Sequence, residues 1–449
     1  MKNMFHKCMK AAGRVRILAA AAVLLLLSGP AMAAVPDESQ FIFNTFSFLV
    51  HGFLVMWMAA GFAMLEAGLV RTKNTTMQCL KNVGLFSIAT IMYYVIGYNL
   101  MYNGVDKGFM GTIGLWGHDD SAALGGKFAG EGVTAYAASS DFFFQLVFVA
   151  TAASIVSGTV AERIKLWGFL IFVVVLTGVI YPIQGAWQWG GGWLAEKGFA
   201  DFAGSTLVHS VGGWAALTGA IILGARKGKY GADGSVRPMP GANLPLATLG
   251  TFILWLGWFG FNGGSQLTMG SAKDVIAIAN IYITTNIAAA GGVVAAIVLT
   301  QIIYKKVDLT MALNGALAGL VSITAGPDSP SLGLALIIGA IGGVIVVVVV
   351  PLLDKFKIDD VVGAIPVHLC DGIWGTMAVP LSNGDAKFAT QALGVAAIGG
   401  FVIVTSAIVW MVIKAVIGIR VSSEAEEMGL DMAECGMEAY PEFRGSQSI

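Results

Sequence analysis

Apolar runs long enough to cross a membrane recur along the chain, and short polar segments separate them. A membrane-spanning helix needs about 20 predominantly apolar residues. The pattern therefore predicts an all-α polytopic membrane protein with eleven transmembrane helices. The expected spans cover residues 41–70, 76–104, 140–161, 167–187, 203–224, 244–262, 275–303, 310–325, 331–353, 361–381 and 391–419.

The N-terminus has the pattern of a secretory signal. A basic segment precedes a short apolar run at 17–27, and Ala31-Met32-Ala33 forms a small-x-small cleavage site. Retention as a first helix is the alternative, but the run is short for a span. We therefore expect cleavage after Ala33. The expected divisions are a signal peptide at 1–33, a membrane domain at 34–420 and a cytoplasmic tail at 421–449.

The distribution of basic residues predicts the orientation. An external mature N-terminus and an odd number of spans place the tail in the cytoplasm. Most Lys and Arg residues then fall in cytoplasmic segments, as the positive-inside rule requires. The predicted outer segments hold only Lys107, Lys127, Lys197, Lys273 and Lys387. We expect a multi-pass protein of the cell inner membrane.

Composition supports this class and narrows the function. Of 449 residues, 56% are hydrophobic and 12% are charged, whereas soluble domains are about 25% charged. The net charge of −1 gives no reason to expect a nucleic-acid partner. The cysteine spacing fits neither a zinc site nor a disulfide framework, so we expect no metal and no cofactor. The cysteines are Cys8, Cys79, Cys370 and Cys435.

Two histidines lie in apolar spans, and each follows an aspartate by eight residues. The elements read Asp201-FAGSTLV-His209 and Asp360-VVGAIPV-His368, with Gly213 and Gly372 four residues beyond the histidines. They fall in the fifth and tenth spans, which must cross the membrane in opposite directions. This relation indicates a 5+5 inverted-topology repeat with an additional last helix, and such repeats hold their substrate sites near the membrane midplane.

The chemistry of these elements is open to two interpretations. Each histidine can simply bond to a neighbouring helix, and each aspartate can cap the helix that it begins. Alternatively, ionisable groups at membrane depth mark function. A neutral imidazole both donates and accepts a hydrogen bond, so a pair can line a narrow pore for a small polar solute. Asp201 can also favour a nearby cation.

Aromatic residues offer a similar choice. Trp187, Trp189 and Trp193 surround a triple glycine and can be interfacial anchors. They can also form a cation–π mouth, because Trp is the best ring for a cation. Phe148 and Phe261 lie near the ends of apolar spans, where they can pack or plug a pore.

Several long motifs together resemble the ammonium transporter family (Amt/Mep/Rh), in its bacterial Amt type, over nearly the whole mature chain. They begin at Met64, Ala161, Trp189, Asp201, Gly257, Asp359 and Arg420 and read MLEAGLVRTKN, AERI, WGGGWLA, DFAGSTLVH, GWFGFNGGS, DDVVGAIPVH and RVSSEAEEMGLD. The resemblance implies a transporter rather than an enzyme.

The resemblance also implies roles for individual residues. It assigns His209 and His368 to twin pore histidines and Phe148 and Phe261 to a stacked gate. Trp189, Ser265 and Phe148 resemble an outer ammonium-binding site. Its supporting positions are Asp201, Gln145 and Tyr181.

The mechanism implied by the resemblance is deprotonation of recruited ammonium, passage of ammonia through the pore and net charge movement. Methylammonium is a further expected substrate. The implied assembly is a homotrimer in membrane lipid, with a cytoplasmic PII signalling protein as regulator. The tail offers no room for a signalling enzyme, although a transporter that also signals remains open. Two positions depart from relatives: Gly363 replaces an aspartate, and Cys435 replaces a histidine in the tail.

Two other classes of protein fit the sequence less well than a transporter does. His209 and His368 could be axial ligands of a haem in an electron-transfer protein, but nothing else in the sequence indicates a haem pocket. An intramembrane hydrolase needs a nucleophile and a base within reach, and no motif of that kind is found.

Overall fold

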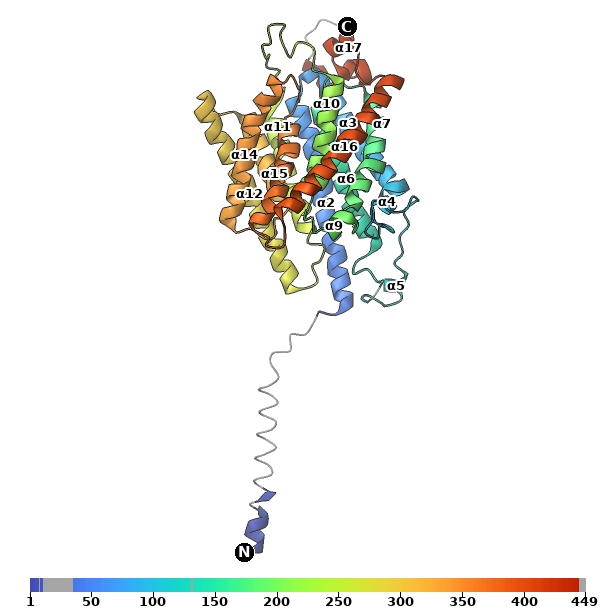
Figure 1. The fold of residues 1–449 in the computed structure, drawn as a ribbon, viewed down its shortest axis with the longest axis vertical. Coiled ribbons are helices and arrows are strands. Elements are labelled where there is room, and N and C mark those ends of the chain that lie inside the picture. The colour runs from blue at the N-terminus through green and yellow to red at the C-terminus, as the bar shows by residue number, and fades with distance from the viewer. Residues whose placement is uncertain (8, 11–34, 131, 444–449) are drawn as a thin grey trace.

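The computed structural model describes residues 1–7, 9–10, 35–130 and 132–443. The apolar run and cleavage site of the expected signal peptide lie outside these residues. Within them the chain is helical, and its only β-contacts are the isolated bridges Ile164–Arg420 and Tyr230–Val236. Most helices run side by side in one bundle, with α17 at one end and α5 at the other (Figure 1).

The helices follow the predicted apolar runs. Four spans contain short π-helical or 3-10 segments in series with α-helix. The bounds are α2 Asp37–Leu69, η1 Thr72–Asn74, α3 Thr75–Met92, η2 Tyr93–Gly97, α4 Tyr98–Tyr102, α5 Ser121–Leu124, α6 Ala138–Thr159, α7 Leu166–Val175, η3 Leu176–Ile180, α8 Tyr181–Ala186, α9 Trp193–Glu196, η4 Ser205–Ser210, α10 Val211–Leu223, α11 Leu244–Gly264, α12 Ala272–Tyr304, α13 Leu309–Ile323, α14 Leu332–Lys355, η5 Ile365–Cys370, α15 Asp371–Ala378, η6 Val379–Leu381, α16 Phe388–Val416, α17 Ser423–Met428, η7 Asp431–Cys435 and η8 Pro441–Phe443.

Length and hydropathy identify a multi-pass membrane protein. Among the described residues, 9 helical segments are long and apolar enough to cross a bilayer. The eighth predicted span forms the shorter α13, and the tenth forms η5 and α15. The prediction of eleven spans therefore stays a prediction.

Glycine lets neighbouring helices touch through their backbones. A Cβ on Gly339 of α14 would lie 1.9 Å from the carbonyl oxygen of Ala288 in α12. On Gly250 of α11, it would lie 2.3 Å from the amide nitrogen of Leu65 in α2. Helices in lipid have no hydrophobic driving force to associate, so close packing through small residues takes its place. The many glycines thus serve close helix packing.

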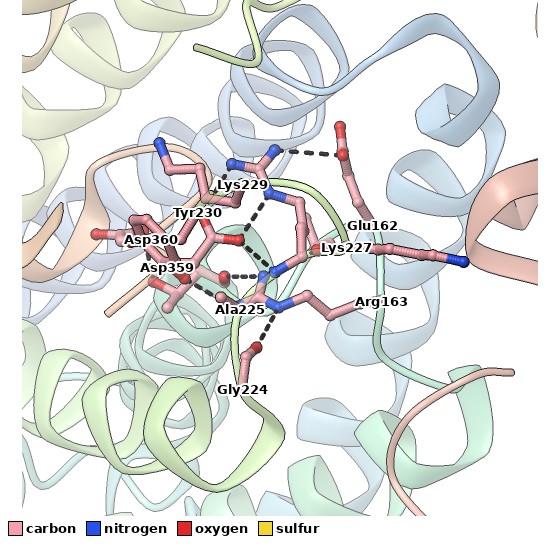
Figure 2. Close-up of polar contacts among 12 residues, drawn as sticks. Glu162, Arg163, Gly224, Ala225, Lys227, Lys229, Tyr230, Asp359 and Asp360 are labelled. Carbon is pink, nitrogen blue, oxygen red and sulfur yellow. Dashed lines mark hydrogen bonds and ion pairs between the residues drawn. The ribbon is translucent and has the colours of Figure 1, made fainter. Parts of the chain in front are cut away.

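One end of the bundle carries a buried charge network (Figure 2). Arg226 donates to both carboxylate oxygens of Asp359, at 2.8 and 2.9 Å, and lies 3.2 Å from Glu162. Arg163 donates to the Asp359 carbonyl at 2.7 Å and the Gly224 carbonyl at 2.9 Å. Arg71 also pairs with Glu162. The network joins the segments that follow α2, α6 and α10 to the one that precedes η5.

The tail packs beneath this network on its own chain. The Asp431 carboxylate accepts from the backbone amides of Thr76 and Met77 at the start of α3, at 3.0 and 2.9 Å. Glu434 accepts from the amide of Leu166 at the start of α7, at 3.0 Å. Both carboxylates thereby satisfy helix-end donors that would otherwise lack a partner. Cys435 lies beside Met77, with sulfur atoms 3.9 Å apart.

We predict that Asp359→Asn destabilises the protein by about 3–5 kcal/mol, because it leaves Arg226 buried without its full counter-charge. Asp354→Asn should cost about 1 kcal/mol or less, because Asp354 and its partner Lys229 are partly exposed. Thermal unfolding in detergent measures both. Equal stability of Asp359→Asn and the unmodified protein would contradict this account.

The destabilisation caused by Asp359→Asn should also depend on pH. Burial raises the pKa of Asp359, but the hydrogen bonds of Arg226 and the charges of Arg163 and Arg226 outweigh it and hold the pKa well below its ordinary 3.8. The stabilising contribution is therefore complete above the unfolded-state pKa and is lost as the pH falls through the lowered value. The difference between the two proteins should stay constant above about pH 5.

Candidate functional site

The two predicted histidine elements have matching local structures. Each begins with an aspartate, turns at a glycine three residues later, and then enters a π-helical segment that carries the histidine. Gly204 has φ 103° and Gly363 has φ 79°, which is the left-handed region that favours glycine. A Cβ on Gly363 would also lie 2.5 Å from the Asn314 side-chain nitrogen. The glycine that departs from relatives therefore fits its own position.

The aspartates act as helix caps. Asp201 is buried, and its two oxygens accept from the amides of residues 204–207 at 2.8–3.0 Å. Asp360 accepts from the Ile365 amide at 2.7 Å and from the Thr159 hydroxyl at 3.0 Å. Both aspartates thus bond backbone amides at a helix start, although the N-cap residues themselves are Gly204 and Ala364. Because its carboxylate is occupied by backbone donors, Asp201 acts on its surroundings through its charge and through the backbone that it fixes.

Two glycines bring the histidines together. A Cβ on Gly213 would lie 2.7 Å from the Leu369 amide, and one on Gly372 would lie 2.3 Å from the Ser205 carbonyl oxygen. Each element therefore touches the other at its glycine. At this crossing the Nδ1 atoms of His209 and His368 are 3.2 Å apart.

This contact limits the chemistry of the pair. With both rings neutral, one Nδ1 must donate and the other must accept. The Nε2 of His209 is buried and has no hydrogen-bond partner, so it is available to a molecule on the path. A haem iron and its porphyrin ring cannot fit between nitrogen atoms this close. The pair therefore disfavours the axial-ligand alternative and suits a narrow polar passage.

The predicted gate residues stack above His209. The ring centroids of Phe148 and Phe261 are 4.0 Å apart at an interplanar angle of 26°. The Phe261 ring lies 5.2 Å from that of His209. On the other side of the pair, the Phe62 ring lies 6.1 Å from that of His368. Each ring in the series from Phe148 to Phe62 thus lies next to the following one.

A cavity of about 350 Å³ lies against the Phe148 side of the stack. Trp189, Phe148, Ser265 and Gln145 are among the residues that line it. Trp189 meets Phe148 edge to face at 6.0 Å, and its Nε1 donates to the Asp201 carbonyl at 2.9 Å. The Ser265 hydroxyl donates to the Phe261 carbonyl at 2.8 Å. Its oxygen lone pairs can therefore accept from a cation.

Other predicted vestibule aromatics lie outside the lining of this cavity. Tyr181 is buried behind it, and its hydroxyl has no hydrogen-bond partner. Trp187 and Trp193 pack against Phe109, and Trp187 donates to the Phe109 carbonyl at 2.9 Å. The role expected of Tyr181 stays a prediction.

Sequence reasoning missed a carboxylate in the cavity wall. Asp141 is 7% exposed, accepts from the Tyr98 hydroxyl, and accepts from Gln145 Nε2 at 3.3 Å. It lies four residues before Gln145, one helical turn away, and this spacing was the available signal. Its charge faces the compartment that holds Trp189 and Ser265.

A second small cavity begins on the other side of the histidines. His368, Phe62, Glu66 and Asn314 line it. Asn314 and Val362 also line a larger cavity that reaches Arg226 and Asp360 in the charge network. The two cavities thus continue the line of rings towards the end of the bundle that carries the tail. Across the described residues, no group of three His, Cys, Asp or Glu side chains could hold a metal ion.

Comparison with known proteins agrees with this arrangement. Residues 46–440 match the Ammonium Transporter Family. Ammonium transporter Amt2 of Archaeoglobus fulgidus is 43% identical over 427 residues, covering 88% of this chain and 87% of the relative. Ammonium transporter Amt1 of Haloferax mediterranei is 38% identical, covering 88% and 79%.

A solved structure titled Sensor Amt Protein superimposes with a TM-score of 0.81 at 34% identity, covering 88% of this chain and 98% of that one. Candida albicans Mep2 shares the fold, with a TM-score of 0.77 at 24% identity. Because the family match spans most of the sequence and the relatives align along most of their length, the chain belongs to the ammonium transporter family, whose members are transporters rather than enzymes.

Proposed function

We propose that the protein recruits ammonium at the outer cavity, removes a proton and conducts ammonia past the phenylalanine pair and the twin histidines, with net charge movement. One observation carries this proposal: a cation-attracting cavity, the Phe148–Phe261 stack and the His209–His368 pair follow one another in contact. This order suits a cation that must lose its charge before it passes.

The recruitment step rests on two kinds of interaction. Trp189 and Phe148 offer ring faces to a small cation, and the Ser265 oxygen can accept one of its hydrogen bonds. Asp141 and Asp201 add negative potential. Ammonium satisfies these contacts, and methylammonium retains most of them.

Deprotonation provides selectivity. Moving a bare cation through the apolar stack would cost several kcal/mol or more. Ammonium avoids this cost by passing as neutral ammonia, whereas potassium has no proton to lose. The released proton follows a histidine-linked route, so that each ammonia crosses with one positive charge.

The remaining features complete the proposal. The protein lies in the cell inner membrane with eleven spans, arranged as a 5+5 inverted repeat and one added helix. Its mature N-terminus is outside, and its tail is in the cytoplasm. Three copies form a homotrimer in lipid, with one pore in each. The docked tail is the surface on which a PII signalling protein or a neighbouring subunit acts.

In proteoliposomes, we expect ammonium and methylammonium to produce an inward current on a solid-supported membrane. The measurement covers a range of pH and potential. A folded protein that carries no current under any of these conditions would overturn the proposed function.

We expect combined His209→Leu and His368→Leu replacement to abolish the ammonium current or to admit potassium, because the polar passage and its proton route are both removed. His118→Leu, on an exposed loop, is the control and should behave as the unmodified protein. Unchanged rate and selectivity in the double variant would refute the role of the pair.

We expect Trp189→Leu to raise the ammonium concentration for half-maximal current about tenfold, since a partly desolvated cation–π contact contributes roughly 1–2 kcal/mol. Trp193→Leu changes a neighbouring ring outside the cavity lining and should have little effect. Current recorded across a concentration series distinguishes the two. An unchanged half-maximal concentration for Trp189→Leu would remove this ring from the recruitment site.

A further inference from the structure

A buried carboxylate lies on the inner side of the histidine pair. Glu66, near the end of α2, is 1% exposed and lines the small cavity together with His368. This cavity has room for on the order of one water molecule. Its contents can therefore contact both side chains at the same time.

The two oxygens of Glu66 have different surroundings. Oε2 accepts from Gln78 Nε2 at 2.8 Å, from Asn82 Nδ2 at 3.1 Å and from the Ser157 hydroxyl at 2.7 Å. Oε1 is buried and has no hydrogen-bond partner. One oxygen is thus fixed by three donors, and the other is free to exchange a proton.

We propose that Glu66 is the inner acid–base group of transport, which returns a proton to ammonia after it leaves the histidine pair. The inference rests on the proposed function and assigns its inner half-reaction. The protonated carboxyl gives its proton to the ammonia lone pair, which yields a carboxylate and ammonium. A proton arriving along the histidine-linked route then restores the carboxyl. One proton and one ammonia cross in each cycle, so atoms and charge balance.

The charge environment suits a group that alternates between two states. Lys81 of α3 is fully buried and donates to the Ser157 carbonyl at 2.7 Å, so one shared residue links it to Glu66. This cation can balance the carboxylate. The other titratable side chains on neighbouring elements are Cys79 of α3, His368 of η5 and Arg163 behind Lys81. Two other helices pack against α2, which carries Glu66. Helix α11 has no titratable side chain, and Asp141 lies at the end of α6 that is far from Ser157.

The product has a route outward from this position. Asn314 and Val362 line both the small cavity and the larger cavity that reaches Asp360 and Arg226. Ammonium formed at Glu66 therefore has a polar compartment ahead of it rather than the apolar stack. The carboxylates Asp354 and Asp360 and the basic side chains Arg226 and Lys229 all line that compartment.

Two substitutions distinguish an acid–base role of Glu66 from a purely structural role. Glu66→Gln can keep its carbonyl oxygen in the place of Oε2 and retain all three hydrogen bonds, but it cannot give up a proton to ammonia. Glu66→Asp keeps the acid but withdraws it from those donors. If Glu66 is an acid–base group, the current should be largest in the unmodified protein, smaller in Glu66→Asp and smallest in Glu66→Gln. If its role is structural, Glu66→Gln should carry more current than Glu66→Asp.

The test measures ammonium current in proteoliposomes for both variants, with thermal unfolding in detergent as the check on folding. We expect about a 100-fold or greater loss for Glu66→Gln, as for removal of a positioned acid–base group, and a smaller loss for Glu66→Asp. The matched control is Glu38→Gln, the same change at the exposed start of the same helix. A current for Glu66→Gln that equals or exceeds that of Glu66→Asp would overturn the proposal.

Ser157→Ala provides a second measurement that stands even where Glu66→Gln does not fold. Losing this hydroxyl removes a hydrogen bond to the charged form of Glu66, so the pH midpoint of the current should move upward. An unchanged pH profile would overturn the proposal. Absence of current in the unmodified protein would instead reject the proposed function, and the two failures are therefore distinguishable.

Discussion

Burial of polar groups in an apolar bundle is the constraint on which the structure depends, because a polar group at membrane depth is costly without a partner. The chain meets it by pairing such groups with each other or with backbone. His209 bonds to His368, and Asp201 bonds to the first turn of its own helix. Two of the buried atoms left without a partner, His209 Nε2 and Glu66 Oε1, belong to residues beside the path, where a small solute could supply the missing partner.

Close backbone packing allows this arrangement. The histidine elements can touch only because Gly213 and Gly372 place no side chain between them. The same two glycines follow their histidines at equal spacing, and both elements turn at a left-handed glycine after the capping aspartate. Local structure thus repeats in two segments that share little other sequence. Physical requirements at a crossing point can preserve such a pattern where general similarity is weak.

Sequence could predict the apolar helices, the aspartates at helix starts and the two histidine elements, because each has a local signal, whereas the roles of Phe148 and Phe261 came from the family resemblance. The spacing from Asp201 to His209 recurs from Asp360 to His368, and hydropathy locates both elements in spans. Glu66 and Asp141 could not be identified in the same way. Their meaning depends on partners from other helices, such as Ser157 for Glu66 and Tyr98 for Asp141. The eighth predicted span, 310–325, was already short, and α13 matches it at Leu309–Ile323.

The docking of the tail has a consequence for truncation studies. Asp431 and Glu434 occupy amide groups at the starts of α3 and α7, two helices that cross the bundle. Cutting the chain after residue 420 would therefore do more than delete a surface for other proteins. It would leave backbone amides in the first turns of two membrane helices without their carboxylate partners. Loss of activity in a protein without its tail could therefore come from damaged helix ends or from lost regulation. Single substitutions on exposed residues of α17 would change regulation and leave the helix ends intact.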